Sequence, residues 1–241
     1  MQQQAPAKKK GSADIVFLLD VSGSMQPCIN ALKNNIGEFI DYLTNPGPNA
    51  QAVVKDWRIK IAGYSDYVAD GDEWWQEFPF SSDADQVKDN LSDLAPKWGG
   101  DEPESLLDAL WKLSKMPETS RETTPEPGAW RHRSDATRVV IIFTDATFHS
   151  EVAIPEVQGA KSEDVAREVM AAGIILSVFC PEADCYHDLA MIDSCEVNFV
   201  GDLENAVENM ESFTADIENF KKTLEQLAKT VTAASCSVAI L

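Results

Sequence analysis

The sequence predicts an α/β fold with one doubly wound, mostly parallel central sheet of about six strands and helices on both faces. Short, continuous apolar runs recur along the 241 residues, and such runs fit strands that are buried on both faces of a parallel sheet. Segments with apolar residues at helical spacing lie between these runs, and alternating strands and helices indicate parallel βαβ units. No internal repeat is present, and the alternation of strands and helices indicates one domain.

The first half of the predicted sheet begins at the apolar run AspIleValPheLeuLeuAsp (14–20). Apolar residues at helical spacing follow over 29–43, and AsnProGlyProAsn (45–49) is expected to end that helix in a turn. The alternating segment 57–65 is predicted as the next strand, with a short strand beside it over 74–80.

Two helices and one irregular segment are expected next. Ser82 and Asp85 form a capping-box pattern at the start of a predicted helix over 83–94. Leucine and tryptophan residues at helical spacing predict another helix over 106–113. Residues 117–136 are rich in Pro, Thr, Glu and Arg and have no periodicity, so we expect a surface insertion.

The second half of the sheet follows from the same alternation. A strand, a helix, a strand, a short helix and a strand are expected over residues 138–144, 162–172, 174–180, 186–192 and 196–200. Beyond them, apolar residues from 203 to 227 recur about every three and a half positions and predict one long helix or two.

The two ends of the chain carry weaker signals. Residues 1–12 are polar and are expected to form a disordered arm, without the apolar stretch of a secretory signal. The domain is expected to span 13–230. The tail 231–241 contains an apolar segment, 235–241, that is a candidate edge strand.

Acidic residues dominate the charge of the chain. The net charge is −20 at pH 7 and the sequence pI is about 4.4, which argues against nucleic acid or anionic membrane surfaces as partners because both need a basic face. No apolar run approaches the roughly 20 residues of a membrane helix. Twelve acidic residues and two lysines lie between Ala62 and Glu104, which predicts either a solvated acidic face or an edge that attracts cations.

The cysteines are odd in number and lack metal-binding spacing. No CxxC pair occurs among the five, which are Cys28, Cys180, Cys185, Cys195 and Cys236, and a chain of this length does not need disulfides to fold. Reduced thiols are therefore expected, and with them a cytoplasmic location. Pairing of Cys185 with Cys195 is left open.

Oxygen-bearing side chains follow the first predicted strand. AspValSerGlySer (20–24) stands where a buried strand ends and a helix begins, and open α/β sheets bind ligands beyond the carboxyl ends of their strands. Asp20, Ser22 and Ser24 offer hard oxygen ligands that suit Mg²⁺, Ca²⁺ or Mn²⁺. The same residues also fit a simpler role as caps of the strand end and the helix start.

Two further acidic loops favour a metal site over simple capping. GlyGlyAspGluProGlu (99–104) precedes a predicted helix, and Asp145 directly follows the apolar run ValValIleIlePheThr. Carboxylates from three loops are expected to gather at one edge of the sheet. Clustered carboxylates repel one another, and a divalent cation removes that repulsion.

These three loops, in this order and spacing, resemble the von Willebrand factor type A domain, whose hallmark is the metal-ion-dependent adhesion site (MIDAS). The resemblance covers roughly residues 13–230 and implies the Rossmann-like fold of that family. It implies that Asp20, Ser22 and Ser24 hold a divalent cation, Mg²⁺ first and Ca²⁺ or Mn²⁺ as alternatives. It further implies that Asp145 contributes as the third-loop carboxylate, often through water in this family.

The second loop resembles one branch of that family. AspGluProGlu (101–104) is similar to the integrin β-subunit I-like domain, which implies that Glu104 is a direct metal ligand. That branch has a second, neighbouring cation site, and the resemblance implies that its ligands here are Asp66, Asp101, the Pro103 carbonyl and Glu104. Gly99 stands where that branch has an asparagine ligand, so the second site matches less well.

Two other positions are interpreted through the same branch. Its third cation site uses acids just after the first loop, whereas this chain has Gln26, Pro27 and Cys28, so we expect no third site. AspAlaThrPheHis (145–149) resembles the integrin β pattern and gives His149 a structural role in the loop rather than a ligand role.

The leading hypothesis for function is a metal-dependent protein-interaction module, in which a partner's carboxylate completes the coordination of the cation. A regulatory scaffold in an intracellular ATPase or kinase complex is the alternative and would use the same site. A metal-dependent phosphohydrolase fits less well. Ser22 stands where an aspartyl phosphotransferase needs an acid, and the sequence has no GxxxxGK[ST] loop and no Ser–His–Asp pattern, so we expect no catalytic residues.

Four tryptophans are candidates for a protein interface. Trp74, Trp75, Trp98 and Trp130 are expected in loops or edges near the predicted metal face, and tryptophan is favoured at interface hot spots. Packing on the sheet edge explains each of them equally well.

Overall fold

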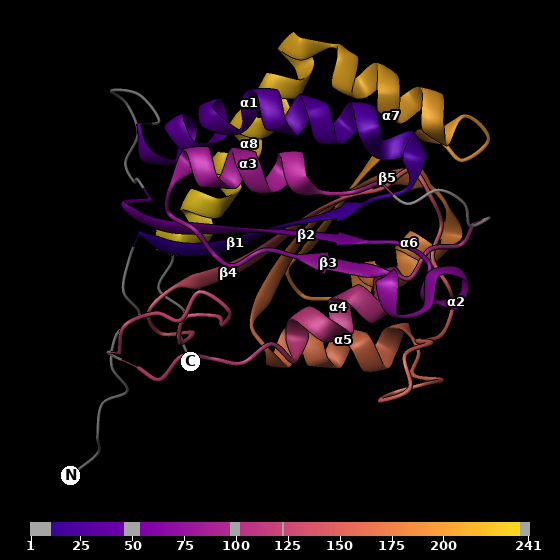
Figure 1. The fold of residues 1–241 in the computed structure, drawn as a ribbon, viewed down its shortest axis with the longest axis horizontal. Helices are drawn as coiled ribbons and strands as arrows, with labels where there is room; N and C mark the ends of the chain where they lie inside the picture. The colour runs from indigo at the N-terminus through magenta and orange to yellow at the C-terminus, as the bar shows by residue number, and fades with distance from the viewer. Residues whose placement is uncertain (1–10, 46–53, 97–101, 122, 237–241) are drawn as a thin grey trace.

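The computed structural model describes residues 11–45, 54–96, 102–121 and 123–236 and shows a six-stranded sheet between two layers of helices (Figure 1). The strands are β1 (Ser12–Asp20), β2 (Asp56–Tyr64), β3 (Trp75–Glu77), β4 (Thr137–Phe143), β5 (Ile174–Glu182) and β6 (Cys195–Asp202). Their order is β3-β2-β1-β4-β5-β6, and every pair is parallel except β2 with β3. The predicted fold class is confirmed.

The helices are divided between the two faces of the sheet (Figure 1). One face carries α1 (Gln26–Thr44), α3 (Ala84–Asp93), α7 (Ala206–Ala215) and α8 (Ile217–Cys236). The other face carries α4 (Leu106–Ser114) and α5 (Ser162–Ala171), with the short helices α2 (Tyr67–Asp70) and α6 (Asp184–His187). Short 3-10 turns complete the loops at 23–25, 71–73 and 188–191.

β1 lies in the middle of the sheet and is buried along its whole length. Successive side chains of a strand point to opposite faces, so β1 supplies two hydrophobic cores. Ile15, Phe17 and Leu19 pack in the core under α1, α3 and α8. Val16 and Leu18 pack in the core under α4 and α5. This explains why the predicted strand is a continuous apolar run.

The strand order creates a topological switch point beside β1. β2 pairs with one edge of β1 and β4 pairs with the other, and all three run in the same direction. Asp20 is in register with Tyr64 of β2, and Leu19 is in register with Phe143 of β4. The loops that follow these three strands therefore leave the sheet at one edge, where ligands of such sheets bind.

Several predicted boundaries need correction. The capping residue of α3 is Asp83, whose side chain accepts from the backbone N–H of Asp85, and not Ser82. The strand expected over 74–80 is only three residues long in β3. The chain stays beside β2 after β3 but pairs with it irregularly, through Phe78 N–H to Ile61 O and an isolated bridge between Ser81 and Ile59.

The end of the chain is helical further than expected. Two helices, α7 and α8, occupy the last apolar stretch because Asp216 has a non-helical ψ of 83° between them. Ser235 and Cys236 belong to α8, so an edge strand beginning at Ser235 is wrong, and residues 237–241 of that segment lie outside the described residues.

The predicted disordered arm is shorter than expected at its inner end. Ser12 is the first residue of β1 and is buried, and the backbone N–H of Gly11 donates to Ser235 O of α8. The rest of the arm, residues 1–10, lies outside the described residues.

The segment 117–136 is irregular, as expected, but it is anchored in the molecule. Thr119, Trp130 and Arg131 are at most 5% exposed, and Trp130 packs in the core under α4. All five cysteines carry free thiols, so Cys185 and Cys195 do not pair. No helix in the described part of the chain is long and apolar enough to cross a membrane.

Candidate metal centre

Asp20 is the central side chain at the carboxyl edge of the sheet. It is fully buried and accepts two hydrogen bonds, at 2.8 Å from the Ser22 backbone N–H and at 2.9 Å from the Thr144 hydroxyl. The Ser22 and Ser24 hydroxyls lie 3.1 Å apart. These neighbours are neutral, so the predicted first metal loop presents one buried carboxyl and two hydroxyls without a positive charge.

The other two predicted loops are tied to each other by backbone contacts. The Glu104 N–H donates to Thr147 O at 2.9 Å, and the His149 N–H donates to Glu104 O at 3.0 Å. These bonds fix Glu104 against the loop that begins at Asp145. Both acidic side chains are at most 5% exposed. Each has one buried carboxylate oxygen, Oε2 of Glu104 and Oδ2 of Asp145, without a hydrogen-bond partner.

The three acids act on one another electrostatically. Burial raises the pKa of Asp20 to about 7, and the charge of Asp145 adds to the shift. Burial, followed by the charge of Asp20, raises the pKa of Glu104 to about 9. Burial also raises the pKa of Asp145, against a lowering contribution from the Ser24 hydroxyl. Desolvation and mutual repulsion both disfavour the ionised forms.

The donor set fits a hard divalent cation. In the described part of the chain, no Lys or Arg forms an ion pair with Asp20, Glu104 or Asp145. No group of three or more His, Cys, Asp and Glu side chains among the described residues is placed to hold a metal by itself. A cation here would therefore draw on the serine hydroxyls and on water together with the acids, which is the oxygen set that Mg²⁺ and similar ions prefer.

A comparison with family models assigns the chain to a known domain family. The model of the von Willebrand factor type A domain matches residues 14–228, most of the chain. The chain belongs to the von Willebrand factor type A family. The family resemblance read from the three loops is thereby confirmed. No curated relative matches the sequence.

Solved structures support the fold of this von Willebrand factor type A domain. It is similar to proximal thread matrix protein 1 (PTMP1) from the mussel byssus, with a TM-score of 0.53 and 16% identity over 97% of this chain and 48% of that one. A second crystal form gives a TM-score of 0.51 and 15% identity over 89% and 50%. A third PTMP1 structure, with a zinc-occupied MIDAS motif, gives 0.51 and 16% over 89% and 50%. The chain spans about half the length of these neighbours.

The residues predicted for a second cation site are only partly brought together. The Asp66 carboxylate accepts from the backbone N–H groups of Val68 and Ala69 as the N-cap of α2. Its Oδ1 also lies 3.3 Å from Ser105 Oγ and 2.8 Å from His149 Nε2. A second cation would compete with these protein donors. Pro103 is half-buried, and Asp101 and Gly99 lie outside the described residues, so this site stays a prediction.

Three positioning residues escape the sequence pattern. Thr144 holds Asp20, although its only signal is its place before Asp145. Asp108 is fully buried inside α4, and its Oδ1 accepts at 2.8 Å from the N–H groups of Ala153 and Ile154. The Tyr186 hydroxyl donates to the carbonyl of Ala146. Asp108 and Tyr186 fix the loop that carries Asp145 from outside it, which local periodicity does not reveal.

The tryptophans do not all lie near the metal face. Trp130 is fully buried at the other end of the sheet, where its indole N–H donates to Leu113 O, so its predicted position is wrong. The reason is that the segment 117–136 folds back toward the amino ends of the strands. Trp74 is 6% exposed and Trp75 is half-buried, both beside β2. Trp98 lies outside the described residues.

Proposed function

We propose that this chain is a metal-dependent protein-binding module. A divalent cation is held by Asp20, Ser22, Ser24 and Glu104, with Asp145 acting through water, and a carboxylate of a partner protein completes its coordination. When bound, the cation supplies positive charge and an open coordination position. The residues of this chain hold the site, exclude bulk water from the three acids and orient their oxygens.

One observation carries the proposal. Three acidic side chains from three separate loops are buried together at the switch point of the sheet, and each has a raised pKa. Two of them have a buried oxygen without a hydrogen-bond partner. Buried acids without partners are costly, and a bound cation offsets that cost directly.

The oxygen ligands favour Mg²⁺ and also admit Ca²⁺ or Mn²⁺. Zinc belongs among the ions to test, since one PTMP1 structure has a zinc-occupied MIDAS motif.

The charge around the site restricts the partner. Asp70 and Asp72 follow Asp66 in α2 and in the turn after it, and their field repels a generally acidic protein. A single acidic side chain in a neutral or basic surface satisfies both the cation and the surrounding field. Such a requirement for two features at once is a source of specificity.

Calorimetry with Mg²⁺ tests the metal site. We expect a binding isotherm for the wild type and none for Asp20→Ala. Asp85→Ala is the matched control, because it removes one exposed carboxylate from α3, away from the site, and should bind as the wild type does. Equal binding by the Asp20→Ala protein would refute the assignment of this site.

A further inference from the structure

A groove separate from the candidate metal centre is lined by residues of α2, β3 and α4 and of the segments beside them; Figure 1 shows where these elements lie. It is a groove of about 630 Å³ between the 67–77 segment and α4 with the segment that follows it. Aromatic and apolar side chains form much of its lining, namely Tyr67, Trp74, Trp75, Trp111, Met116 and Ile154. Trp75 and Trp111 are half-buried and both line the groove, and the indole nitrogen of Trp75 is itself buried.

The groove begins beside the candidate metal centre. The backbone N–H of Tyr67 donates to Ser105 Oγ at 2.9 Å, and the same hydroxyl contacts Asp66. The Tyr67 ring lines the groove and packs edge-on against Trp74 at 6.0 Å. Tyr67 therefore connects the lining of the groove to Ser105, the residue next to Glu104.

The charges of the groove favour an uncharged occupant. Lys112 Nζ lies 5.5 Å from the centre of the Trp75 ring, and Lys115 Nζ lies 4.6 Å from that of Trp111, so a basic segment would meet like charge at the ring faces. Asp72, Glu77 and Glu156 on the same lining would repel an acidic segment. Internal ion pairs already bind two of these charges, Glu77 with Lys60 and Lys115 with Glu168.

The shape and lining point to an extended peptide. A volume of about 630 Å³ is that of a small-ligand cleft, about 300–1,000 Å³, which holds a few residues and not a helix. Aromatic-lined grooves bind proline-containing segments because these are already extended in solution. We propose that this groove binds an uncharged, proline-containing segment of the same partner whose carboxylate completes the metal site, an inference that rests on the proposed function.

Nuclear magnetic resonance of the indole N–H groups tests the groove without metal. The probe is a capped ten-residue peptide of proline, leucine and glutamine, added to the full chain in chelator. We expect the Trp75 and Trp111 signals to shift, while Trp57, which packs against the core on the other face, stays unchanged. Unmoved Trp75 and Trp111 signals at millimolar probe, or equal shifts with a capped Gly–Ser peptide, would overturn the proposal.

Variants locate the binding on α4. Trp111→Ala is expected to weaken probe binding at least tenfold, and Trp111→Gln serves if the alanine variant fails to fold. Met170→Ala is the matched control, because Met170 is an exposed apolar residue of α5 outside the groove. Concentration-dependent dimers that Trp111→Ala abolishes would show that a second copy occupies the groove and would overturn the proposal.

A glutamate added to one end of the probe separates this inference from the proposed function. In Mg²⁺ we expect the glutamate to strengthen binding at least fivefold in the wild type and not in Asp20→Ala, with the indole shifts retained in both. Indole shifts without any gain from the glutamate would refute the shared partner and count against the proposed function, while leaving the groove as a peptide site.

Discussion

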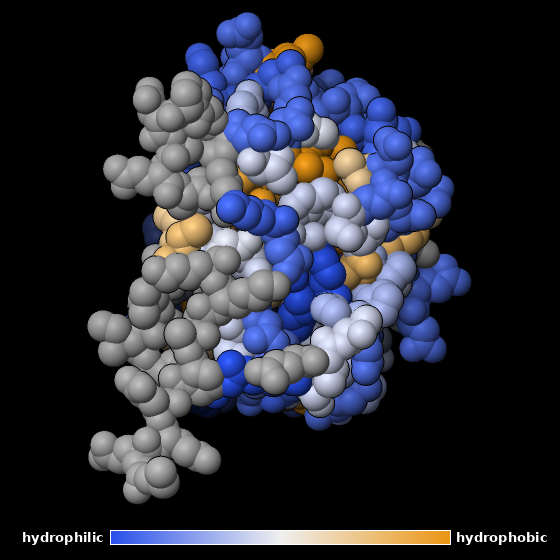
Figure 2. Space-filling view, turned by 90° about the vertical axis from the view of Figure 1, so that its left-hand side faces the viewer, coloured by the Kyte–Doolittle hydropathy of each residue, from blue (hydrophilic) through white to orange (hydrophobic). Residues whose placement is uncertain are grey.

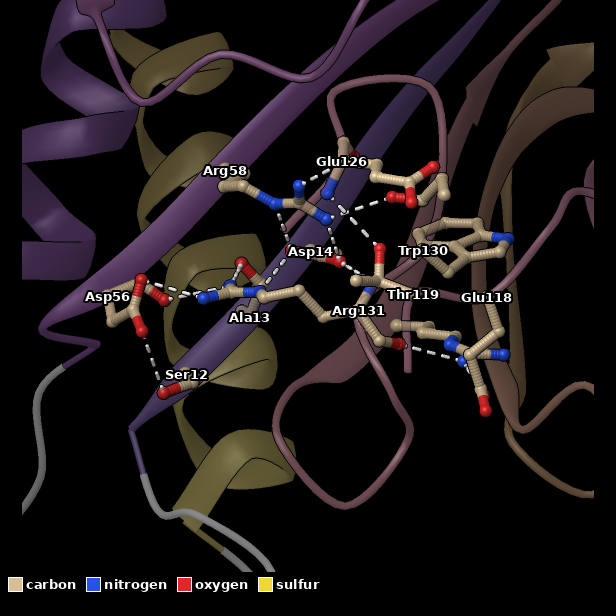
Figure 3. A network of polar contacts seen from close by, with 12 residues as sticks. Ser12, Ala13, Asp14, Asp56, Arg58, Glu118, Thr119, Glu126, Trp130 and Arg131 are labelled. Carbon is tan, nitrogen blue, oxygen red and sulfur yellow. Dashed lines mark hydrogen bonds and ion pairs between the residues drawn. The ribbon is translucent and has the colours of Figure 1, made fainter. Parts of the chain in front are cut away.

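β1 carries a buried aspartate near each of its ends, and the two have opposite surroundings. Asp14 and Asp20 are six residues apart, point to the same face of the sheet and are both fully buried. Asp14 receives four hydrogen bonds of 2.7–3.0 Å, two from the Arg58 side chain and two from the side chain and backbone of Arg131 (Figure 3). Asp20 receives two, both from neutral groups.

The amino end of the sheet is electrostatically complete. Besides Asp14, the Arg58 guanidinium donates to the carbonyls of Glu126 and Ala129, and that of Arg131 donates to the carbonyl of Ala13. A cavity of about 720 Å³ borders these arginines, and strongly hydrophilic residues gather at this end of the molecule (Figure 2). Because their donors are already used inside the protein, these arginines join the 117–136 segment to the sheet.

The different surroundings of Asp14 and Asp20 distinguish a structural carboxylate from one in a candidate binding site. At the amino end the buried carboxylate is neutralised by arginines that the chain supplies itself. At the carboxyl edge the charges of Asp20 and Asp145 add to the raised pKa of Glu104, and no Lys or Arg of the described residues pairs with these acids, so they are neutralised by protons or by a bound cation. A buried charge with its own partner indicates structure, and one without a partner indicates a ligand.

The largest loss of stability is expected from a substitution at the amino end of the sheet. Asp14→Asn leaves two buried guanidinium groups without their shared counter-charge, and breaking a buried pair in this way costs about 3–5 kcal/mol. Asp56, which contacts Arg131 Nη1 at 2.7 Å, limits the loss. Urea unfolding should show a lower midpoint.

Asp20→Asn is the matched control, since it makes the same chemical change on the same strand. It should not be destabilised in metal-free buffer. Equal losses in both variants would contradict the contrast between the two ends.

A cation should stabilise the protein only through the carboxyl edge of the sheet, where Asp20, Glu104 and Asp145 lie. At 100 times its dissociation constant, Mg²⁺ should raise the free energy of unfolding by about 2.7 kcal/mol in the wild type and not in Asp20→Asn. Asp14→Asn should keep the response, because its defect lies at the other end. Thermal unfolding with and without chelator measures this, and a response retained by Asp20→Asn would refute the site.

The sequence predicted the residues at the carboxyl edge of the sheet better than those at the amino end. Asp20, Ser22 and Ser24 are read from one loop because the signal is local: an apolar strand followed by oxygen-bearing residues. The sequence pattern identifies Asp14 only as the start of a strand, since its partners are 44 and 117 residues away. Pairings over such separations leave no periodic pattern.

The misplacement of Trp130 has the same physical origin. Its segment has no periodicity, and the contacts that position it are the Arg131 bonds to Asp14 and the Trp130 indole bond to Leu113 O. The fold class was predictable because continuous apolar runs indicate strands that are buried on both faces of a sheet. The capping residue Asp83 was missed by one position, because Ser82 and Asp83 are both good N-cap types.

Replacement of one repelling acid gives a smaller effect. In metal-free buffer at about pH 8, Asp20→Asn should be more stable than the wild type by on the order of 1 kcal/mol, since it removes a buried charge that raises the pKa of Glu104. The asparagine oxygen still accepts from Ser22 N–H. Urea midpoints compare the two proteins, and a less stable asparagine variant would contradict the view that Asp20 is repelled in the metal-free state.

The pH dependence of stability tests the protonation of Asp20 and Glu104 at the carboxyl edge. The pKa values of Asp20 and Glu104 are raised to about 7 and about 9 in the folded protein, whereas the unfolded values lie near 3.8 and 4.5. Between these limits the folded state binds more protons than the unfolded state, so the free energy of unfolding falls as pH rises. The stabilising contribution is complete below about pH 4 and is lost by about pH 9.

Comparing the wild type with Asp20→Asn separates the contribution of Asp20 from those of the other carboxylates. In chelator, the difference in urea midpoint between wild type and Asp20→Asn should grow in favour of the variant from about pH 5 to about pH 8, because only the wild type ionises Asp20 there. Saturating Mg²⁺ should flatten or reverse this pH dependence of the midpoint difference. The cation favours the ionised carboxylates of the wild type, and it binds less well at low pH because protons compete for them. A difference that is constant with pH in chelator would show that Asp20 is ionised throughout, and that the carboxyl end is as well neutralised as the amino end.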